Sequence, residues 1–256
     1  MSDFDRNPAT ARTGYRTDQV AIDAGLRAYM IRVYNYMASG VALTGVVSWL
    51  TYQAAGGDAI QVAGGQISGL TAFGQAIFSG PLTIVLFIAT LGIVFFMSFR
   101  INRLQASTAL GLFMFYAALL GVMLSSVFLV YTGASITRTF FISAASFGAL
   151  SLYGYTTQRD LSPIGSFLIM GLFGLIIAML VQMWLQSPGL DFAISAIGVL
   201  IFAGLTAWDT QRIKEMYSAM DDGTVAGRKA VMGALSLYLD FINLFLFLLR
   251  FMGNRR

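Results

Sequence analysis

Two acidic residues, Asp209 and Asp240, are the side chains of this sequence that could carry out chemistry within apolar surroundings. Asp240 lies in the middle of the apolar stretch 229–250. An ionised carboxylate at the centre of a membrane-spanning helix costs roughly 2.5–3.5 kcal/mol on insertion scales, so it needs a partner or a proton. Asn243 lies one turn after Asp240 and Ser236 one turn before it, so the three side chains share a helical face. We expect this polar face to point at other protein rather than at lipid.

Asp209 lies near the end of the apolar segment 192–212, and Arg212 shares its helical face. The loop 213–228 then returns the chain to the segment that holds Asp240, so the two carboxyl groups can come close. Two like charges in a low dielectric cannot both be kept at low cost, so such a pair would share one proton. A simpler interpretation of Asp209 is an ion pair with Arg212 or a helix cap at the membrane interface.

The composition is that of an integral membrane protein. Of the 256 residues, 57% are hydrophobic and 11% are charged, against about 25% charged in soluble domains. The sequence contains no cysteine and no histidine, which excludes disulfides, thiolate or imidazole metal sites and catalytic triads with a histidine base. We predict no enzymatic activity and no cofactor. The net charge of +4 is spread over the loops, which favours a role in membrane topology over nucleic-acid binding.

Apolar segments recur along the chain, and most have the roughly 20 residues that a helix needs to cross the hydrocarbon core. A β-barrel would show alternating hydrophobicity, which is missing, and lipid offers the backbone no hydrogen-bond partner. The sequence therefore predicts an all-α protein with seven transmembrane helices. The segments cover residues 30–54, 81–99, 107–131, 137–156, 164–185, 192–212 and 230–250.

The polar residues 1–28 carry mixed charge and lack the pattern of a signal peptide, so we predict a largely disordered cytosolic tail before a single membrane domain, 29–253. Lysine and arginine side chains set the orientation. Four of them fall on the side opposite the N-terminus if seven helices cross: Arg138, Arg250, Arg255 and Arg256. The other twelve fall on the side of the N-terminus, which we therefore place in the cytosol: Arg6, Arg12, Arg16, Arg27, Arg32, Arg100, Arg103, Arg159, Arg212, Lys214, Arg228 and Lys229.

The three arginines at the C-terminus fit poorly with a seventh full crossing. Either the last helix is an exception to the charge rule, or it is short and central and does not fully cross; the side of the C-terminus stays open at this stage. The glycine-rich segment 55–80 lacks the ending of a phosphate-binding loop and is predicted to be a connector outside the cytosol. Four glycines in apolar segments are predicted to be close-packing points between helices: Gly111, Gly121, Gly171 and Gly174.

Four stretches carry a family resemblance. The run ALSLYLDFINLFLFLLRFMG, residues 234–253, resembles the closing helix of the Bax inhibitor-1 family, the transmembrane Bax-inhibitor-motif proteins. AWDTQRI, residues 207–213, resembles the sixth-helix motif of that family. FLVYTGASI (128–136) and FGALSLYGYTT (147–157) resemble bacterial members. The similarity covers roughly residues 80–250, while the tail and the first loop carry little of it.

The resemblance implies six helices surrounding a central, hydrophobic seventh helix. It also implies that Asp209 and Asp240 form a proton-sensitive latch on a calcium leak. From the residues alone, Asn243 either supports the pair from the face that it shares with Asp240 or only bonds neighbouring helices together. In some members an arginine near the end of the second helix bonds to the pair. Arg100 in FFMSFRINRL is the nearest candidate, with Arg103 as a rival. An equally good interpretation of Arg100 is that it anchors the helix at the membrane surface.

Three functions compete. The first is a pH-sensitive, calcium-permeable leak channel of a bacterial inner membrane, since carboxylate and carbonyl oxygens are the ligands that Ca²⁺ prefers and Asp209 and Asp240 would line its path. The second is an interaction protein that modulates a membrane-bound ATP-dependent protease or a stress response through residues 1–28. The third is an intramembrane aspartyl protease. The motifs of those enzymes are a Tyr-Asp pair and a Gly-x-Gly-Asp sequence. This chain has Trp208-Asp209 and Leu239-Asp240 instead.

Overall fold

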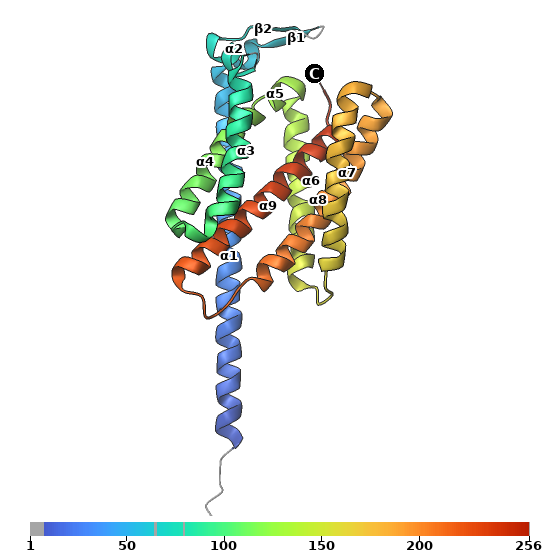
Figure 1. The fold of residues 1–256 in the computed structure, drawn as a ribbon. Helices are drawn as coiled ribbons and strands as arrows, with labels where there is room; N and C mark the ends of the chain where they lie inside the picture. The colour runs from blue at the N-terminus through green and yellow to red at the C-terminus, as the bar shows by residue number, and fades with distance from the viewer. Residues whose placement is uncertain (1–7, 64–65, 79, 256) are drawn as a thin grey trace, which may run out of the picture.

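Helices make up nearly all of the structure, a computed structural model that describes residues 8–63, 66–78 and 80–255 (Figure 1). The one sheet in these residues is a short antiparallel hairpin of β1 (Gln61–Ala63) and β2 (Gln66–Ser68), which follows the 3-10 turn η1 (Gly57–Ala59). A second 3-10 turn, η2 (Ile101–Arg103), follows α3. The helices are α1 (Pro8–Ala54), α2 (Ala72–Phe78), α3 (Leu82–Arg100), α4 (Ala106–Leu124), α5 (Val127–Val130), α6 (Gly133–Thr156), α7 (Ser162–Leu185), α8 (Pro188–Glu215) and α9 (Gly223–Met252).

Each of the seven predicted segments coincides with a long helix: α1, α3, α4, α6, α7, α8 and α9. Among the described residues, five stretches are long and apolar enough to cross a membrane: α3, α4 with its extension α5, α7, α8 and α9. The helices α1 and α6 carry more polar side chains; on α6 these include the buried Ser135, Thr139, Ser143 and Ser151. The protein is therefore an all-α membrane protein, as predicted, and the count of seven spans stays a prediction.

The outer faces of α3 and α7 are apolar and exposed. Phe99 on α3 is 82% exposed and Trp184 on α7 is 91% exposed, and many aliphatic side chains beside them are exposed as well. A soluble monomer rarely shows apolar surface on this scale, but a lipid bilayer covers it at no cost. These two faces are where the protein meets the hydrocarbon.

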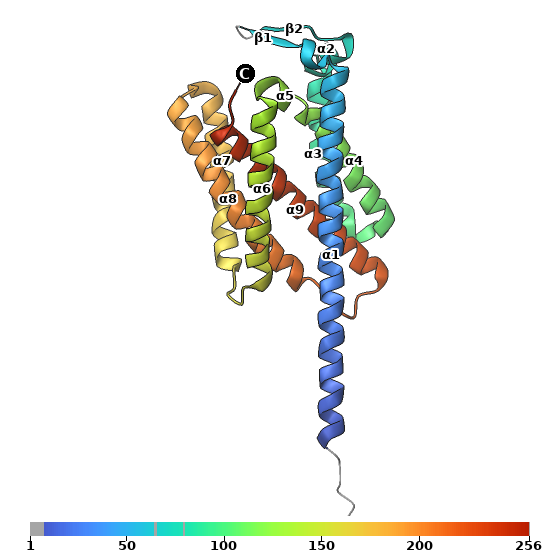
Figure 2. The same cartoon turned by 180° about the vertical axis from the view of Figure 1, so that it is seen from behind.

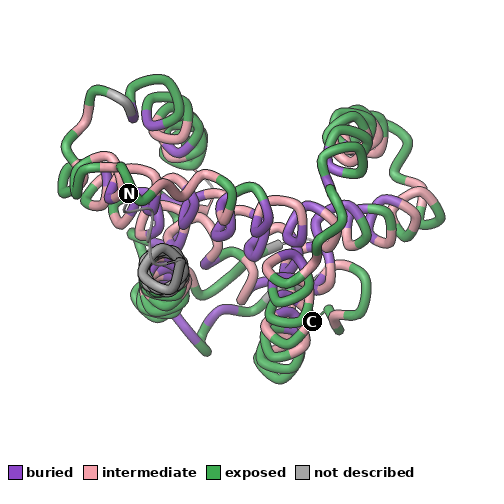
Figure 3. Tube along the Cα trace, turned by 90° about the horizontal axis from the view of Figure 1, so that it is seen from below, coloured by how far each residue is buried: buried purple, intermediate pink, exposed green. Residues whose placement is uncertain are grey.

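The last long helix, α9, lies in the middle of the fold and crosses it obliquely (Figures 1 and 2). It packs directly against α1, α4, α6 and α8, while α3 packs on α4 and α7 packs on α8. Seen from below, α1 and α6 lie on one side of α9, α3 and α7 lie on the other, and the buried residues concentrate along the middle (Figure 3). The predicted central C-terminal helix is confirmed, and α3 and α7 complete its surround as outer helices.

Hydroxyl groups tie α9 to its neighbours. The fully buried Tyr238 hydroxyl lies 2.6 Å from Thr44 Oγ1 on α1, and Thr44 Oγ1 donates a 2.8 Å hydrogen bond to the carbonyl oxygen of Ala117 on α4. Buried polar groups with partners are tolerated in a low dielectric, and they fix the register of the helices that share them. This chain of bonds holds α1, α4 and α9 together at one level of the fold.

The two ends of the described chain lie at opposite ends of the fold. The N-terminal part of α1 projects beyond the bundle, and the C-terminus lies beside the β hairpin at the other end (Figures 1 and 2). The helix α9 therefore runs the length of the bundle and is not a short central helix. Residues 8–28 belong to α1, and the division into a cytosolic tail, 1–28, and a membrane domain, 29–253, stays a prediction. Residues 1–7 lie outside the described residues.

Asn254 and Arg255, near the C-terminus, are held by the first turns of α6 and α8. The Thr132 N–H donates to the Asn254 carbonyl oxygen (3.2 Å), and the Asn254 N–H donates to Ser135 Oγ (3.0 Å). Asp191, in the first turn of α8, accepts a 2.8 Å hydrogen bond from Arg250 Nε and lies 3.5 Å from a terminal nitrogen of Arg255. Asp191 thus offsets part of the positive charge of the arginines at the end of α9.

Neighbouring helices pack closely at only some of the glycines for which close packing was predicted. A methyl group added at Gly121 would lie 2.7 Å from the carbonyl oxygen of Thr44, so α4 approaches α1 closely there, as predicted. At Gly171 it would lie 3.3 Å from a methyl group of Ile201, a tight contact with a side chain. Gly111 and Gly174 have open space around them, so for these two the prediction was wrong, because both face away from the neighbouring helices.

Candidate functional site

The helix α8 carries Asp209 two turns before its C-terminal end. The Ser187 side chain caps the start of α8, and Pro188 occupies its first turn, where a missing N–H does no harm. Near the other end, Gln211 is buried and uses both ends of its amide: Oε1 accepts from the Leu161 N–H and Nε2 donates to the Arg159 carbonyl oxygen, both at 2.8 Å. This clamp fixes the end of α8 that carries Asp209 against the loop between α6 and α7.

The helix α9 carries Asp240 near its midpoint. Asp222 caps the start of α9 by accepting a 2.7 Å hydrogen bond from the Val225 N–H. Asp240 is 5% exposed, and its Oδ2 is fully buried without a hydrogen-bond donor among the described residues. A buried carboxylate oxygen without a donor is expensive, so a proton on this carboxyl group, or on a neighbour, is the arrangement that the surroundings favour.

Asp209 and Asp240 come together in the structure. Their carboxyl groups lie within hydrogen-bonding reach of each other, although 30 residues of chain separate them. Asp209 is partly buried and Asp240 is buried. Two carboxyl groups can hydrogen-bond to each other only when at least one is protonated. The structure therefore brings the two predicted carboxyl groups together, and the shared proton stays a prediction.

Arg212 is the cation that acts on the pair. It is the charged group that lowers the energy of an ionised Asp209, and its guanidinium carbon lies 5.4 Å from the centre of the Trp208 ring. The side chain of Arg212 is exposed, so water screens its charge more than it would at a buried position. Arg212 therefore favours the ionised form of Asp209 without cancelling its charge.

A cavity of about 660 Å³ between α7, α8 and α9 contains the pair. Its walls are mostly apolar side chains of α7 and α8, among them Leu175, Met179 and Phe202. The volume and the sparse polar groups are typical of binding sites and permeation vestibules, where few polar groups set the chemistry. The polar side chains that line it are Asp209, Arg212, Ser236, Asp240, Asn243 and Arg250.

The polar face predicted on α9 lines this cavity. Ser236, Asp240 and Asn243 all face it, and the Asn243 amide donates a 2.8 Å hydrogen bond to the carbonyl oxygen of Leu239 on its own helix. Since that bond stays within α9, Asn243 does not tie α9 to another helix. The side-chain amide oxygen of Asn243 is not used in that bond and can face the cavity, which is consistent with a supporting role.

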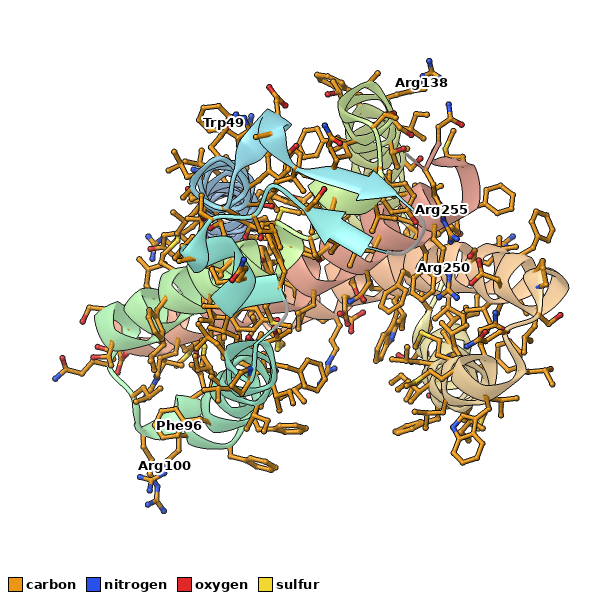
Figure 4. The ribbon with its side chains drawn as sticks, turned by 90° about the horizontal axis from the view of Figure 1, so that it is seen from above. Trp49, Phe96, Arg100, Arg138, Arg250 and Arg255 are labelled. Atoms are coloured by element: carbon orange, nitrogen blue, oxygen red, sulfur yellow. The ribbon has the colours of Figure 1, made fainter. Side chains whose placement is uncertain are left out.

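The predicted role of Arg100 is not supported by its position. Arg100 ends α3, its side chain is exposed, and it points away from the fold in the view from above, on the far side from Arg250 (Figure 4). Arg103 is exposed as well, and neither arginine lines the cavity. The helix α3 packs on α4 and not on α8 or α9, so its C-terminal arginines extend to the membrane surface, where such side chains find water.

Arg250 is a cavity residue that the sequence interpretation missed. It lies at the end of the cavity opposite Arg212 and is paired there with Asp191. A signal was present, because Ser236, Asn243 and Arg250 follow one another at intervals of seven residues and so share a helical face. Arg250 was instead assigned to the membrane surface because it ends the apolar run.

Calcium has few fixed oxygen ligands at this site. The described residues contain no group of three or more acidic, histidine or cysteine side chains that could hold a metal ion. Ca²⁺ takes six to eight oxygen ligands, and Asp209, Asp240, Ser236 and Asn243 supply fewer than that from side chains.

Comparisons with known proteins identify the family. The family described as "Inhibitor of apoptosis-promoting Bax1" matches residues 26–256, so the chain belongs to the Bax inhibitor-1 family, as its motifs predicted. An uncharacterized protein of Rickettsia prowazekii (strain Madrid E) is 50% identical over 234 residues, which cover 91% of this chain and 92% of the relative. The inner membrane protein YbhL of Escherichia coli (strain K12) is 45% identical over 236 residues, covering 91% of this chain and 94% of the relative.

Proposed function

We propose that this protein is a pH-sensitive, calcium-permeable leak of the bacterial inner membrane, with Asp209 and Asp240 as its latch. The observation that carries the proposal is the contact between two carboxyl groups inside a cavity of the membrane domain. The inner-membrane location is supported by the name of the relative YbhL and by the five helices apolar enough to cross a bilayer.

The latch works through one proton. When one carboxyl group is protonated, it donates a hydrogen bond to the other and holds α8 against α9. When pH rises and that proton leaves, two like charges remain in a low dielectric and repel each other. The repulsion separates α8 from α9 at the cavity, and a two-state shift of this kind can open a path for ions.

Charge at the cavity supports cation passage in the deprotonated state. Asp209 and Asp240 then offer carboxylate oxygens, and Ser236 and Asn243 offer neutral oxygens nearby. Arg212 is exposed at one end, and Arg250 is occupied by Asp191 at the other. The positive charges at the two ends are thus partly screened or neutralised, while the centre becomes negative.

The test is calcium flux from liposomes that contain the purified protein, measured from pH 5 to pH 9. Asp209→Asn and Asp240→Asn each keep the size of the side chain but remove one charge, so each is expected to flatten the dependence of flux on pH. Asp58→Asn, which changes an exposed carboxylate in the loop before β1, is the matched control and is expected to keep the wild-type profile. Two site variants with the wild-type pH midpoint and amplitude would sink the shared-proton latch.

A second candidate function is supported by the projection of α1 beyond the bundle (Figures 1 and 2). A helix that leaves the membrane domain offers a surface to a soluble or membrane-bound partner, such as an ATP-dependent protease. Removal of residues 2–23 distinguishes the two functions. A channel is expected to keep its flux and to leave turnover by the protease unchanged, whereas an interaction protein is expected to lose its effect on that turnover and to show no flux with or without these residues.

A further inference from the structure

The helices α1 and α6 form an open seam on the side of the fold away from α7. Both pack against α9, and few of their backbone positions approach each other, although a side-chain hydrogen bond between Tyr34 and Ser151 joins them. Figure 2 shows them side by side with α9 passing behind, and Figure 3 shows both on the same side of α9. A seam between two helices that face the bilayer is accessible to lipid molecules.

A cavity of about 560 Å³ lies in this seam. Ile31 on α1 and Leu152 on α6 form its edges and are 48% and 63% exposed, while Phe147 on α6 is buried beneath them. The volume is within the range of small-molecule sites, and the walls are apolar. A second cavity, of about 360 Å³, lies farther along the same seam between Gly45 and Phe141.

The Tyr34 and Ser151 hydroxyl groups in the first cavity already have partners. Tyr34 and Ser151 lie on opposite walls with their oxygens 2.6 Å apart, and Ser151 Oγ is 2.9 Å from Thr210 Oγ1 on α8. Satisfied hydroxyl groups do not require a polar ligand. The interior therefore suits a hydrocarbon chain.

One end of the cavity is positively charged. Arg27 on α1 lines that end, and no described residue forms an ion pair with it. Tyr155 lines the same end from α6; Lys214 donates a 2.9 Å hydrogen bond to the Tyr155 carbonyl oxygen, and its ammonium lies 5.5 Å from the Tyr155 ring centre. Apolar walls with cations at one end match the charge distribution along a phospholipid.

We propose that this cavity is a binding site for an anionic glycerophospholipid, with one acyl chain between α1 and α6 and the phosphate on Arg27. A guanidinium binds phosphate oxygens in a bidentate manner, and Lys214 adds a second positive charge within reach of a headgroup. The other chain remains in the bilayer beside Leu152. This inference does not depend on the aspartate latch.

The experiment titrates the purified, delipidated, full-length protein with phosphatidylglycerol or phosphatidylcholine and counts bound lipids by native mass spectrometry. The wild-type protein is expected to bind one phosphatidylglycerol molecule more tightly than any further ones. It is also expected to bind that molecule more tightly than it binds phosphatidylcholine. Arg27→Gln is expected to weaken that site about tenfold. Arg32→Gln makes the same charge change on the same helix outside the cavity, and is expected to leave the site intact.

A second pair of variants tests the acyl-chain part. Gly148 lines the cavity and has no atom within 4 Å of an added Cβ, so Gly148→Phe places a ring in the cavity and is expected to abolish the tight site. Gly174→Phe adds the same group to open space on α7 and is the control. Unchanged binding in Gly148→Phe, equal losses in Arg27→Gln and Arg32→Gln, or equal affinity for both lipids would overturn the proposal.

Discussion

At the scale of single residues, the position of Asp240 decides what the site can do. Its Oδ2 has no hydrogen-bond donor among the described residues, and the group within reach of its carboxyl is another carboxyl, that of Asp209. A protein that needed only helix packing at this point would place an apolar side chain there, because an unpaired buried polar atom destabilises the fold. A proton supplied from solution would remove this conflict, which is the physical basis of the proposed response to pH.

Arg212, and not Arg100, is expected to set the pH at which the pair ionises. Removing a positive charge beside a carboxylate makes its ionised form less stable, so Arg212→Gln is expected to move the midpoint of pH-dependent calcium flux upward by about one pH unit or less. Arg100→Gln, at the exposed end of α3, is the matched control and is expected to leave the midpoint in place. A shift in the Arg100 variant alone would restore the partner that the family resemblance implied.

Asn243 is expected to tune the response without creating it. Its amide is bonded within α9 and its carbonyl oxygen is uncharged, so Asn243→Leu removes polarity from the cavity but leaves both carboxyl groups. We expect the midpoint of the flux profile to shift while its amplitude is kept. Complete loss of pH dependence in this variant, with a folded protein by size-exclusion chromatography, would make Asn243 a part of the latch itself.

At the scale of elements, hydropathy located every long helix but could not locate the contacts between them. The predicted segment 192–212 lies inside α8, which extends to residues 188–215 because Ser187 caps it and polar residues continue it past the hydrocarbon. Periodicity says which face of a helix is polar, and this placed Ser236, Asp240 and Asn243 on one face correctly. Which neighbour that face meets is a tertiary property, so the opposite placements of Arg100 and Arg250 could not be derived.

Glycine packing illustrates the same limit and yields a prediction. An added methyl group at Gly154 would overlap the backbone carbonyl of Ala207 where α6 crosses α8, whereas Gly148 on the same helix has open space. Alanine stabilises a helix relative to glycine by roughly 0.5–1 kcal/mol, so Gly148→Ala is expected to be neutral or stabilising. Gly154→Ala is expected to be destabilising by about 1–3 kcal/mol because backbone atoms must move. Unfolding of both variants in detergent measures the difference; equal stability would show that the crossing is looser than described.

At the scale of the whole molecule, the sequence predicted the class of the fold, the family and the central helix. It left the C-terminus open, since charge counting could not see that Asp191, 59 residues before Arg250, would lie beside it. The sequence could not predict the seam between α1 and α6 either, because it arises where both helices pack on α9 and only side chains such as Tyr34 and Ser151 join them. The sequence thus predicted the properties of single segments, such as the position and polarity of each helix. It did not predict the contacts between segments that are far apart in the chain.

The last prediction concerns the orientation of the whole bundle. The β hairpin and the C-terminus lie at one end of the fold, and the loop before α9 lies at the other (Figure 1). The distribution of lysine and arginine predicts that the hairpin end lies outside the cytosol. Ser68 on β2 and Thr224 at the start of α9 are both exposed, and the chain has no cysteine of its own, so Ser68→Cys and Thr224→Cys are clean reporters. In intact spheroplasts, a membrane-impermeant thiol reagent is expected to label Cys at position 68 and to reach position 224 only after the membrane is opened. Labelling of position 224 alone would invert the orientation, and the proposed anionic-lipid site at Arg27 would then lie in the outer leaflet.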